Sequence, residues 1–234
     1  MHSNPQQRAI SAAPVINCTA QLSGTGRIAD DLYLLAHHER TGRPHLQPRA
    51  VGLGLAGALL AELVLPGAIR IWRGLVIPGG GPPPPDALAH TILSAVTGER
   101  EHHPVRDWLL FLARTAAGDV ASRLGEAGFL TRARAAGRWP GRRPRWVPAD
   151  PDSAFAPLVR VKAAVDARGP VPVQHVLLGR LATACGLAHQ MSLYLPPVAR
   201  LHLEGAARYL DPDLRALVAA TQTAVESALL AHRM

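Results

Sequence analysis

Residues 48–65 are the feature of this sequence that most constrains its fold. They read PRAVGLGLAGALLAELVL, with Arg49 and Glu62 as the only charged residues, and Pro66-Gly67 follows at once. Proline in the first turn suits the start of a helix, and a Pro-Gly pair marks its end. The stretch is too short, and with Glu62 too polar, to span a membrane. Because a helix that is apolar all round must be surrounded by other elements, it predicts the buried centre of a helical bundle.

The rest of the chain favours helices around that centre. Of its 234 residues 48% are hydrophobic but only 4% aromatic, so the core must consist mostly of Leu, Val and Ala, and Ala and Leu favour helix over strand. We predict a mainly α fold: a single-domain helical bundle over residues 28–234, with one or two peripheral β-hairpins, after a flexible N-terminal extension at 1–27. We expect helices at 30–38, 48–65, 86–96, 104–128, 153–168, 171–188, 197–209 and 213–231, and hairpins at 68–78 and 132–146.

Charge and cysteine content limit the partners and the compartment. The formal net charge is +8, which indicates an anionic partner, either nucleic acid or an anionic membrane surface. Lys162 is the only lysine, and so much arginine also fits the codon usage of a GC-rich bacterial genome. Two cysteines, Cys18 and Cys185, are too few for a disulfide framework or a cysteine-rich zinc site. Since the N-terminus does not resemble a signal peptide, we expect a cytoplasmic protein.

Three motifs have a functional and a structural interpretation. Gly52, Gly54 and Gly57 form a G-x-G-x-x-G, but helical periodicity continues through them, so close helix packing is the better explanation than a nucleotide site. The pairs His37-His38 and His102-His103 are adjacent on the chain and therefore point apart on a helix, which disfavours metal binding. Asp30 or Asp31 is expected to cap the first helix, and Asp86 the helix at 86–96.

No catalytic set is visible in the sequence, and we expect no metal and no cofactor. The residues favour a binding protein without deciding whether it is an enzyme.

The segment 132–146 is the most suggestive of function. A turn at Pro140-Gly141 predicts a hairpin, and its residues are unusually basic and aromatic. Tryptophan prefers the membrane interface and arginine attracts anionic headgroups, so we expect membrane contact. The alternatives are a solvated basic loop with its tryptophans folded onto the body, or a nucleic-acid surface, which we consider unlikely. The expected membrane-contact residues are Arg138, Trp139, Arg142, Arg143, Arg145 and Trp146.

Several blocks occur in an order that resembles the Golgi phosphoprotein three family. They are LYLLA at 32–36, GLAGALLAELVLPGAI at 54–69, VTGE at 96–99, and the stretch 114–130 that ends in GEAGFL. The resemblance covers residues 29–231 and suggests a bacterial member of actinobacterial type. It implies a mostly helical protein like the eukaryotic members, which bind phosphatidylinositol 4-phosphate at the Golgi surface and retain glycosyltransferases as adaptors. It also implies that the 132–146 hairpin assists membrane insertion and self-association.

The resemblance also implies a ligand pocket, in altered form. The family pattern has a tryptophan before the central helix, an arginine inside its glycine-rich block, and two arginines three apart on a later helix. These positions fall on Gln47, Ala56, Arg114 and Ala117, and only Arg114 keeps its residue type. Charge-assisted hydrogen bonds are each worth about 1.5–3 kcal/mol, so phosphomonoester binding should weaken at least about a hundredfold. Arg106 and Arg123 are the candidates to compensate.

The predicted function is a lipid-binding adaptor that is peripheral on the inner face of the plasma membrane, with a degraded headgroup pocket. Its expected partner is anionic membrane lipid, and self-association through the 132–146 hairpin is a further expectation. The alternative is that the pocket around Arg114 has been repurposed for a small metabolite in a bacterial pathway, with or without catalysis.

Overall fold

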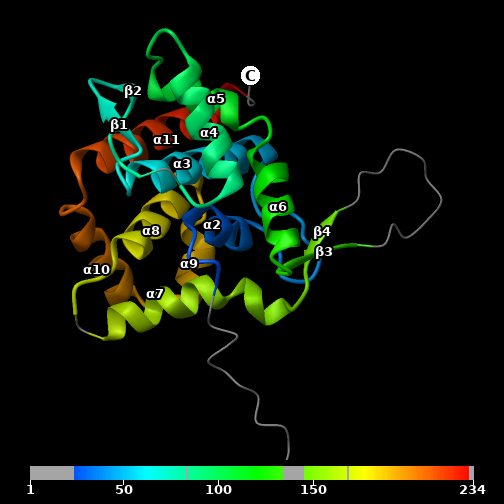
Figure 1. Ribbon diagram of the computed structural model, residues 1–234. Helices are drawn as coiled ribbons and strands as arrows, with labels where there is room; N and C mark the ends of the chain where they lie inside the picture. Colours follow the sequence, from blue (N-terminus) through cyan, green and yellow to red (C-terminus); the bar gives the residue numbers. More distant parts are fainter. Residues whose placement is uncertain (1–23, 83, 134–144, 168, 232–234) are drawn as a thin grey trace, which may run out of the picture.

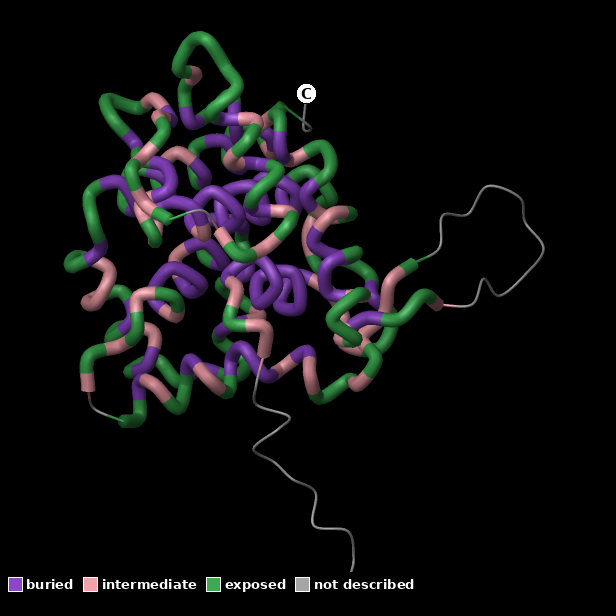
Figure 2. Tube along the Cα trace, in the orientation of Figure 1, coloured by how far each residue is buried: buried purple, intermediate pink, exposed green. Residues whose placement is uncertain are grey.

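The central element of the structure is α3 (Pro48–Val64), around which the other helices pack (Figure 1). The computed structural model describes residues 24–82, 84–133, 145–167 and 169–231. Every residue from Ala50 to Ala61 is buried, and Figure 2 shows the middle of the molecule as continuous buried chain. The prediction that 48–65 forms the buried centre of a helical bundle is therefore confirmed.

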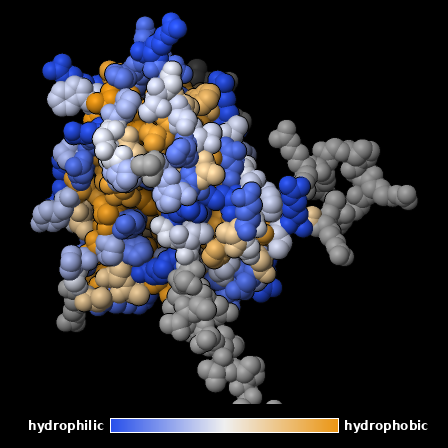
Figure 3. Space-filling view, viewed as in Figure 1, coloured by the Kyte–Doolittle hydropathy of each residue, from blue (hydrophilic) through white to orange (hydrophobic). Residues whose placement is uncertain are grey.

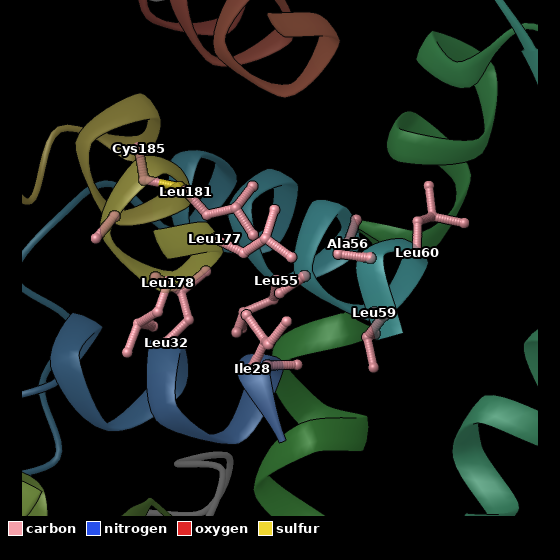
Figure 4. Packing of buried hydrophobic residues seen from close by; sticks show 14 of the residues in the cluster. Ile28, Leu32, Leu55, Ala56, Leu59, Leu60, Leu177, Leu178, Leu181 and Cys185 are labelled. Carbon is pink, nitrogen blue, oxygen red and sulfur yellow. The ribbon is translucent and has the colours of Figure 1, made fainter. Parts of the chain in front are cut away.

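Ten α-helices and two antiparallel hairpins make up the described residues, as the predicted mainly α fold requires. Helices α2, α5, α6, α8 and α11 all pack directly against α3, and α11 also contacts α5 as α2 contacts α6. Leucines of α2 and α8 meet those of α3 in the core (Figure 4). The elements besides α3 are α2 (Ile28–Ala36), β1 (Ile69–Trp72), β2 (Leu75–Pro78), α4 (Ala87–Gly98), α5 (Val105–Leu112), α6 (Ala116–Glu126), β3 (Leu130–Arg132), β4 (Trp146–Pro148), the 3-10 helix η1 (Pro151–Ala154), α7 (Ala156–Asp166), α8 (Val173–Cys185), α9 (Ala188–Tyr194), α10 (Pro197–Ala207) and α11 (Pro212–Ala231).

The three glycines of α3 let three neighbours approach its backbone, as the packing interpretation of G-x-G-x-x-G predicted. A Cβ added at any of them would overlap an atom of another element. A Cβ at Gly52 would lie 2.5 Å from the carbonyl oxygen of Ala113, and a Cβ at Gly57 would lie 2.5 Å from the Oγ1 of Thr221. A Cβ at Gly54 would overlap the Sγ of Cys185. The motif therefore fixes how closely the α5–α6 turn, α8 and α11 pack on the central helix.

The β1–β2 hairpin confirms the prediction at 68–78. Trp72 pairs with Leu75, so Arg73 and Gly74 form a two-residue turn, with φ of 51° and 80°. Positive φ at both positions matches the type I′ turn that suits the twist of a hairpin. Asp213 at the start of α11 accepts hydrogen bonds from the Ile71 N–H at 3.1 Å and the Arg70 Nε at 3.2 Å, which ties the hairpin to the bundle.

Two helix predictions were wrong in detail. The expected helix at 104–128 is divided into α5 and α6, because the backbone N–H groups of Arg114 and Thr115 donate to carbonyls three residues earlier, as in a 3-10 turn. The carbonyl of Ala113, in the same turn, lies against α3. The expected helix at 171–188 ends at Cys185, because Gly186 adopts a left-handed conformation with φ of 96°, and the separate helix α9 follows.

The first helix begins earlier than expected. Its N-cap is Arg27, so Asp30 and Asp31 lie inside α2 and are buried, rather than capping it. The predicted cap at Asp86 is confirmed, since its Oδ2 accepts a hydrogen bond from the Ala89 N–H at 3.1 Å.

Candidate functional site

The β3–β4 hairpin projects from the body beside α6 (Figure 1). Its strands pair antiparallel, with Leu130 opposite Pro148 and Arg132 opposite Trp146. The residues that join the strands, 134–144, lie outside the described part of the chain, and so do four of the predicted membrane-contact residues. These four are Arg138, Trp139, Arg142 and Arg143.

The other two predicted membrane-contact residues, Arg145 and Trp146, lie at the base of this hairpin. Arg145 is exposed, as is Arg132 of β3, and hydrophilic and hydrophobic residues are mixed on the surface where the hairpin leaves the body (Figure 3). Trp146 is half-buried: its ring packs on α6 so closely that a Cβ at Gly125 would lie 2.5 Å from it, and the Arg132 guanidinium lies 5.0 Å from the ring centre. Trp146 thus holds the hairpin base to the body, and its expected membrane contact stays a prediction.

Most of the net positive charge belongs to residues outside the part of the chain that the structure describes, which is called the described body below. All 17 acidic residues are described, but seven of the 25 basic residues are not, which leaves the described body with 18 basic and 17 acidic residues. The undescribed basic residues are Arg8, Arg134, Arg138, Arg142, Arg143, Arg168 and Arg233. Four of the seven lie in the hairpin segment 134–144, so that segment carries half of the formal charge of +8.

The four positions implied by the resemblance lie on neighbouring elements. Arg114 is exposed in the α5–α6 turn, which packs on the first half of α3 at Gly52, and Ala117 is half-buried at the start of α6. Ala56 lies one turn beyond Gly52 on α3 and has no exposed surface. Because Ala56 is sealed in the core, it contributes nothing to an open pocket.

Gln47, the fourth of these positions, is exposed just before α3. It lines a cavity of about 310 Å³ with Arg49, and Ala228 and Ala231 of α11 form the opposite wall. Arg49 is a candidate ligand residue that the sequence analysis did not name. The signal was a basic side chain in the first turn of a helix, where an anion is favoured.

Arg123, a candidate to compensate for the lost arginines, is instead occupied by three carboxylates. Its guanidinium lies 2.6 Å from Asp30, 3.1 Å from Glu62 and 2.7 Å from Asp86, and only 7% of the side chain is exposed. Burial alone would lower the pKa of Arg123, but Glu62 and Asp30 raise it above its usual value. Burial raises the pKa of Glu62. These four residues, the Arg123 cluster, fasten α2, α3, α4 and α6 together and leave no group free for phosphate.

The histidine pair at 37–38 does not form a metal site in the structure. Within the described residues no three His, Cys, Asp or Glu side chains are grouped closely enough to hold a metal ion. His37 stacks on the Tyr33 ring at 3.9 Å, and its Nδ1 lies 2.7 Å from the Tyr33 carbonyl oxygen. Burial lowers the pKa of His37 to about 4. The neutral ring, with Nδ1–H donating to that carbonyl, is therefore a structural element at the end of α2.

Stability should fall on acidification because of His37. An unfolded histidine binds a proton below about pH 6.5, whereas His37 in the folded protein does so only below about pH 4. Between these values the unfolded state binds more protons, so this group should cost up to about 3 kcal/mol as pH falls from 6.5 to 4. The His37→Gln variant keeps a donor for Tyr33 but does not titrate. Urea denaturation at several pH values should show that acidification lowers the free energy of unfolding less in the variant than in the wild type. An equal pH dependence in the two proteins would contradict the assignment of this loss to His37.

A family model described as Golgi phosphoprotein 3 (GPP34) matches residues 28–231 of the chain. A search of curated proteins gave no match. In the part of the chain that the structure describes, no helix is both long enough and apolar enough to cross a membrane.

Proposed function

Because the chain belongs to the Golgi phosphoprotein 3 family, we propose that it is a peripheral lipid-binding adaptor that contacts anionic membranes through its β3–β4 hairpin. The separation of charge carries this proposal: a body close to neutral bears one segment, 134–144, with four arginines, one tryptophan and no acidic residue. Each arginine near an anionic surface contributes about 1 kcal/mol, and the tryptophan suits the interface.

The hairpin base supports this role mechanically. Trp146 packs on Gly125 of α6, and the backbone carbonyl of Trp146 lies against Gly42, whose φ is +60°. These contacts attach the base of the hairpin firmly to the bundle. The exposed side chains of Arg132 and Arg145 extend the basic surface down to the body.

The proposed recognition is of negative charge in general rather than of one headgroup. Of the four positions implied by the family pattern, Ala56 is buried and Ala117 is apolar, so Arg114 would be the only guanidinium left to hold a phosphomonoester. A single charge-assisted contact gives little selectivity over the general attraction of the hairpin.

Vesicle co-sedimentation tests the proposal. The protein should bind two kinds of phosphatidylcholine vesicle about equally well, those that contain phosphatidylglycerol and those that contain phosphatidylinositol 4-phosphate. Binding to both kinds should be lost at high salt. Neutralising three arginines together, in Arg138→Gln, Arg142→Gln, Arg143→Gln, should remove about 3 kcal/mol, or roughly a hundredfold in affinity. Arg114→Ala should change little.

A matched pair of tryptophan variants provides the control. Trp139→Ala should weaken binding several-fold, whereas Trp72→Ala, at the exposed tip of the other hairpin, should not. Equal effects of the two, or full binding by the triple arginine variant, would contradict the proposed contact. If the wild type ignores all vesicles, the cavity beside Gln47 and Arg49 becomes the better candidate, as a site for a small metabolite, because its size approaches that of ligand pockets.

A further inference from the structure

A small cavity between α8, α9 and α10 brings two arginines together. Arg180 of α8 and Arg200 of α10 line a space of about 70 Å³, and Thr183 and Glu204 line it as well. Both guanidinium groups belong to half-buried residues. In Figure 1, α10 lies on the opposite side of the bundle from β3 and β4, so this cavity is separate from the hairpin.

Neither arginine has an ion-pair partner among the described residues. Among the described residues, Arg180 and Arg200 form no hydrogen bond and no ion pair through their side chains, even though Glu204 lies on the same cavity wall. The Nε of Arg200 is buried and has no partner. This contrasts with Arg123, whose guanidinium is bonded to three carboxylates.

An unpaired buried donor is costly, and it is more costly when it is charged. Two like charges that face one small cavity repel each other as well. Such a group in a folded protein calls for an explanation, and one explanation is a bound ion. An oxyanion between the two arginines would satisfy the Arg200 Nε and neutralise the repulsion at the same time.

We propose that Arg180 and Arg200 bind a phosphate group in this cavity. The guanidinium fork matches the oxygens of a phosphate in a bidentate geometry that lysine does not provide. The volume is several times the minimum that a cavity needs to hold one water molecule, so the cavity has room for a phosphate group while the remainder of the ligand stays at the surface. Glu204 limits the affinity, because its carboxylate opposes the anion.

Isothermal titration calorimetry with inorganic phosphate tests the site. The wild type should show saturable binding, and Arg180→Gln or Arg200→Gln should each weaken it at least tenfold. Glu204→Gln should strengthen binding several-fold, which a mere surface attraction elsewhere would not produce. Arg100→Gln, at an exposed arginine of the α4–α5 loop, is the matched control and should leave the affinity unchanged.

Thermal denaturation separates a ligand site from a structural role. Without phosphate, Arg200→Gln should melt no lower than the wild type, because it removes an unpaired charge; phosphate should then raise the melting temperature of the wild type only. A variant that melts lower in both buffers would indicate a structural arginine and overturn the proposal. Absence of saturable phosphate binding by the wild type, or an affinity equal to that of the wild type in both arginine variants, would overturn it too.

Two further ligands identify the source of the phosphate group. Glycerol 3-phosphate and a soluble short-chain phosphatidic acid carry the same phosphate monoester with and without acyl chains. Equal affinities would assign the site to soluble phosphate esters, and tighter binding of the phosphatidic acid would assign it to a lipid headgroup. In both cases binding must depend on Arg180 and Arg200, and the result is independent of the hairpin variants.

Discussion

Replacing Arg123 with methionine should lower the free energy of unfolding by about 3–5 kcal/mol at neutral pH, because it removes the positive member of a buried ionic cluster. The side chain of Arg123 is 7% exposed and those of Asp30, Glu62 and Asp86 are between 1% and 11% exposed, so water does not replace the lost partner. Methionine keeps the apolar stem of Arg123 but ends near the position of its Nε, so part of the cost reflects the space that the guanidinium leaves. Urea denaturation followed by circular dichroism would give the difference.

The pH dependence of this loss identifies its cause. In the wild type, burial raises the pKa of Asp86, but the Ala89 N–H and Arg123 outweigh it, so the pKa is lowered overall. Without Arg123 the carboxylates should hold protons at higher pH. The unfolded chain then binds fewer protons than the variant's folded state in the mildly acidic range, so the deficit of the variant should shrink as pH falls from 7 toward 5.

Two further variants control for a simple packing defect. Arg160→Met breaks a more exposed pair with Asp31 and should cost much less than Arg123→Met. Adding Asp30→Asn and Glu62→Gln to Arg123→Met should recover part of the lost stability, since Asp86 is then the only carboxylate of the cluster that stays charged. No recovery in the triple variant would show that the cluster acts through shape and not through charge.

The Arg123 cluster also shows which contacts cannot be predicted from the sequence. Its members lie 93 residues apart at most, on four elements, and each has an ordinary local explanation: Asp30 as a helix cap, Asp86 as a cap, Arg123 as an exposed or phosphate-binding residue. Only the packing of α2, α4 and α6 around α3 brings them together. A charged residue at position 62 of an otherwise apolar helix was the one signal that such a partner must exist.

The central helix was predictable for the opposite reason, because all of its evidence is local. Its apolar run, Pro48 and Pro66-Gly67 define its length, and its three glycines indicate close neighbours without naming them. The candidate site was only partly predictable. The resemblance placed Arg114 and Ala117 on elements that do adjoin α3, and the apolar run predicted the burial of Ala56, but no local pattern encodes which elements cover it.

Gly52→Ala should destabilise the protein by about 3 kcal/mol or more, at the upper end of overpacking effects. The new methyl group would lie 2.5 Å from the carbonyl oxygen of Ala113, and this oxygen belongs to the backbone of the α5–α6 turn, so no side-chain rotation relieves the overlap. The gain in helix propensity from Gly to Ala, about 1 kcal/mol, is too small to compensate. Chemical denaturation with and without the substitution measures the loss.

Gly54→Ala is the matched comparison, because its obstacle is a side chain. The methyl group would overlap the Sγ of Cys185, whereas the Cβ of Cys185 lies at an ordinary 3.5 Å. Alone, Gly54→Ala should also destabilise, but the double variant with Cys185→Ala should regain most of the loss, since the obstructing atom is gone and alanine favours the helix. Cys185→Ala should give no such rescue of Gly52→Ala. If both glycine variants respond alike to Cys185→Ala, the glycines act through helix flexibility and not through the separate contacts that set the spacing of the α5–α6 turn and α8 around α3.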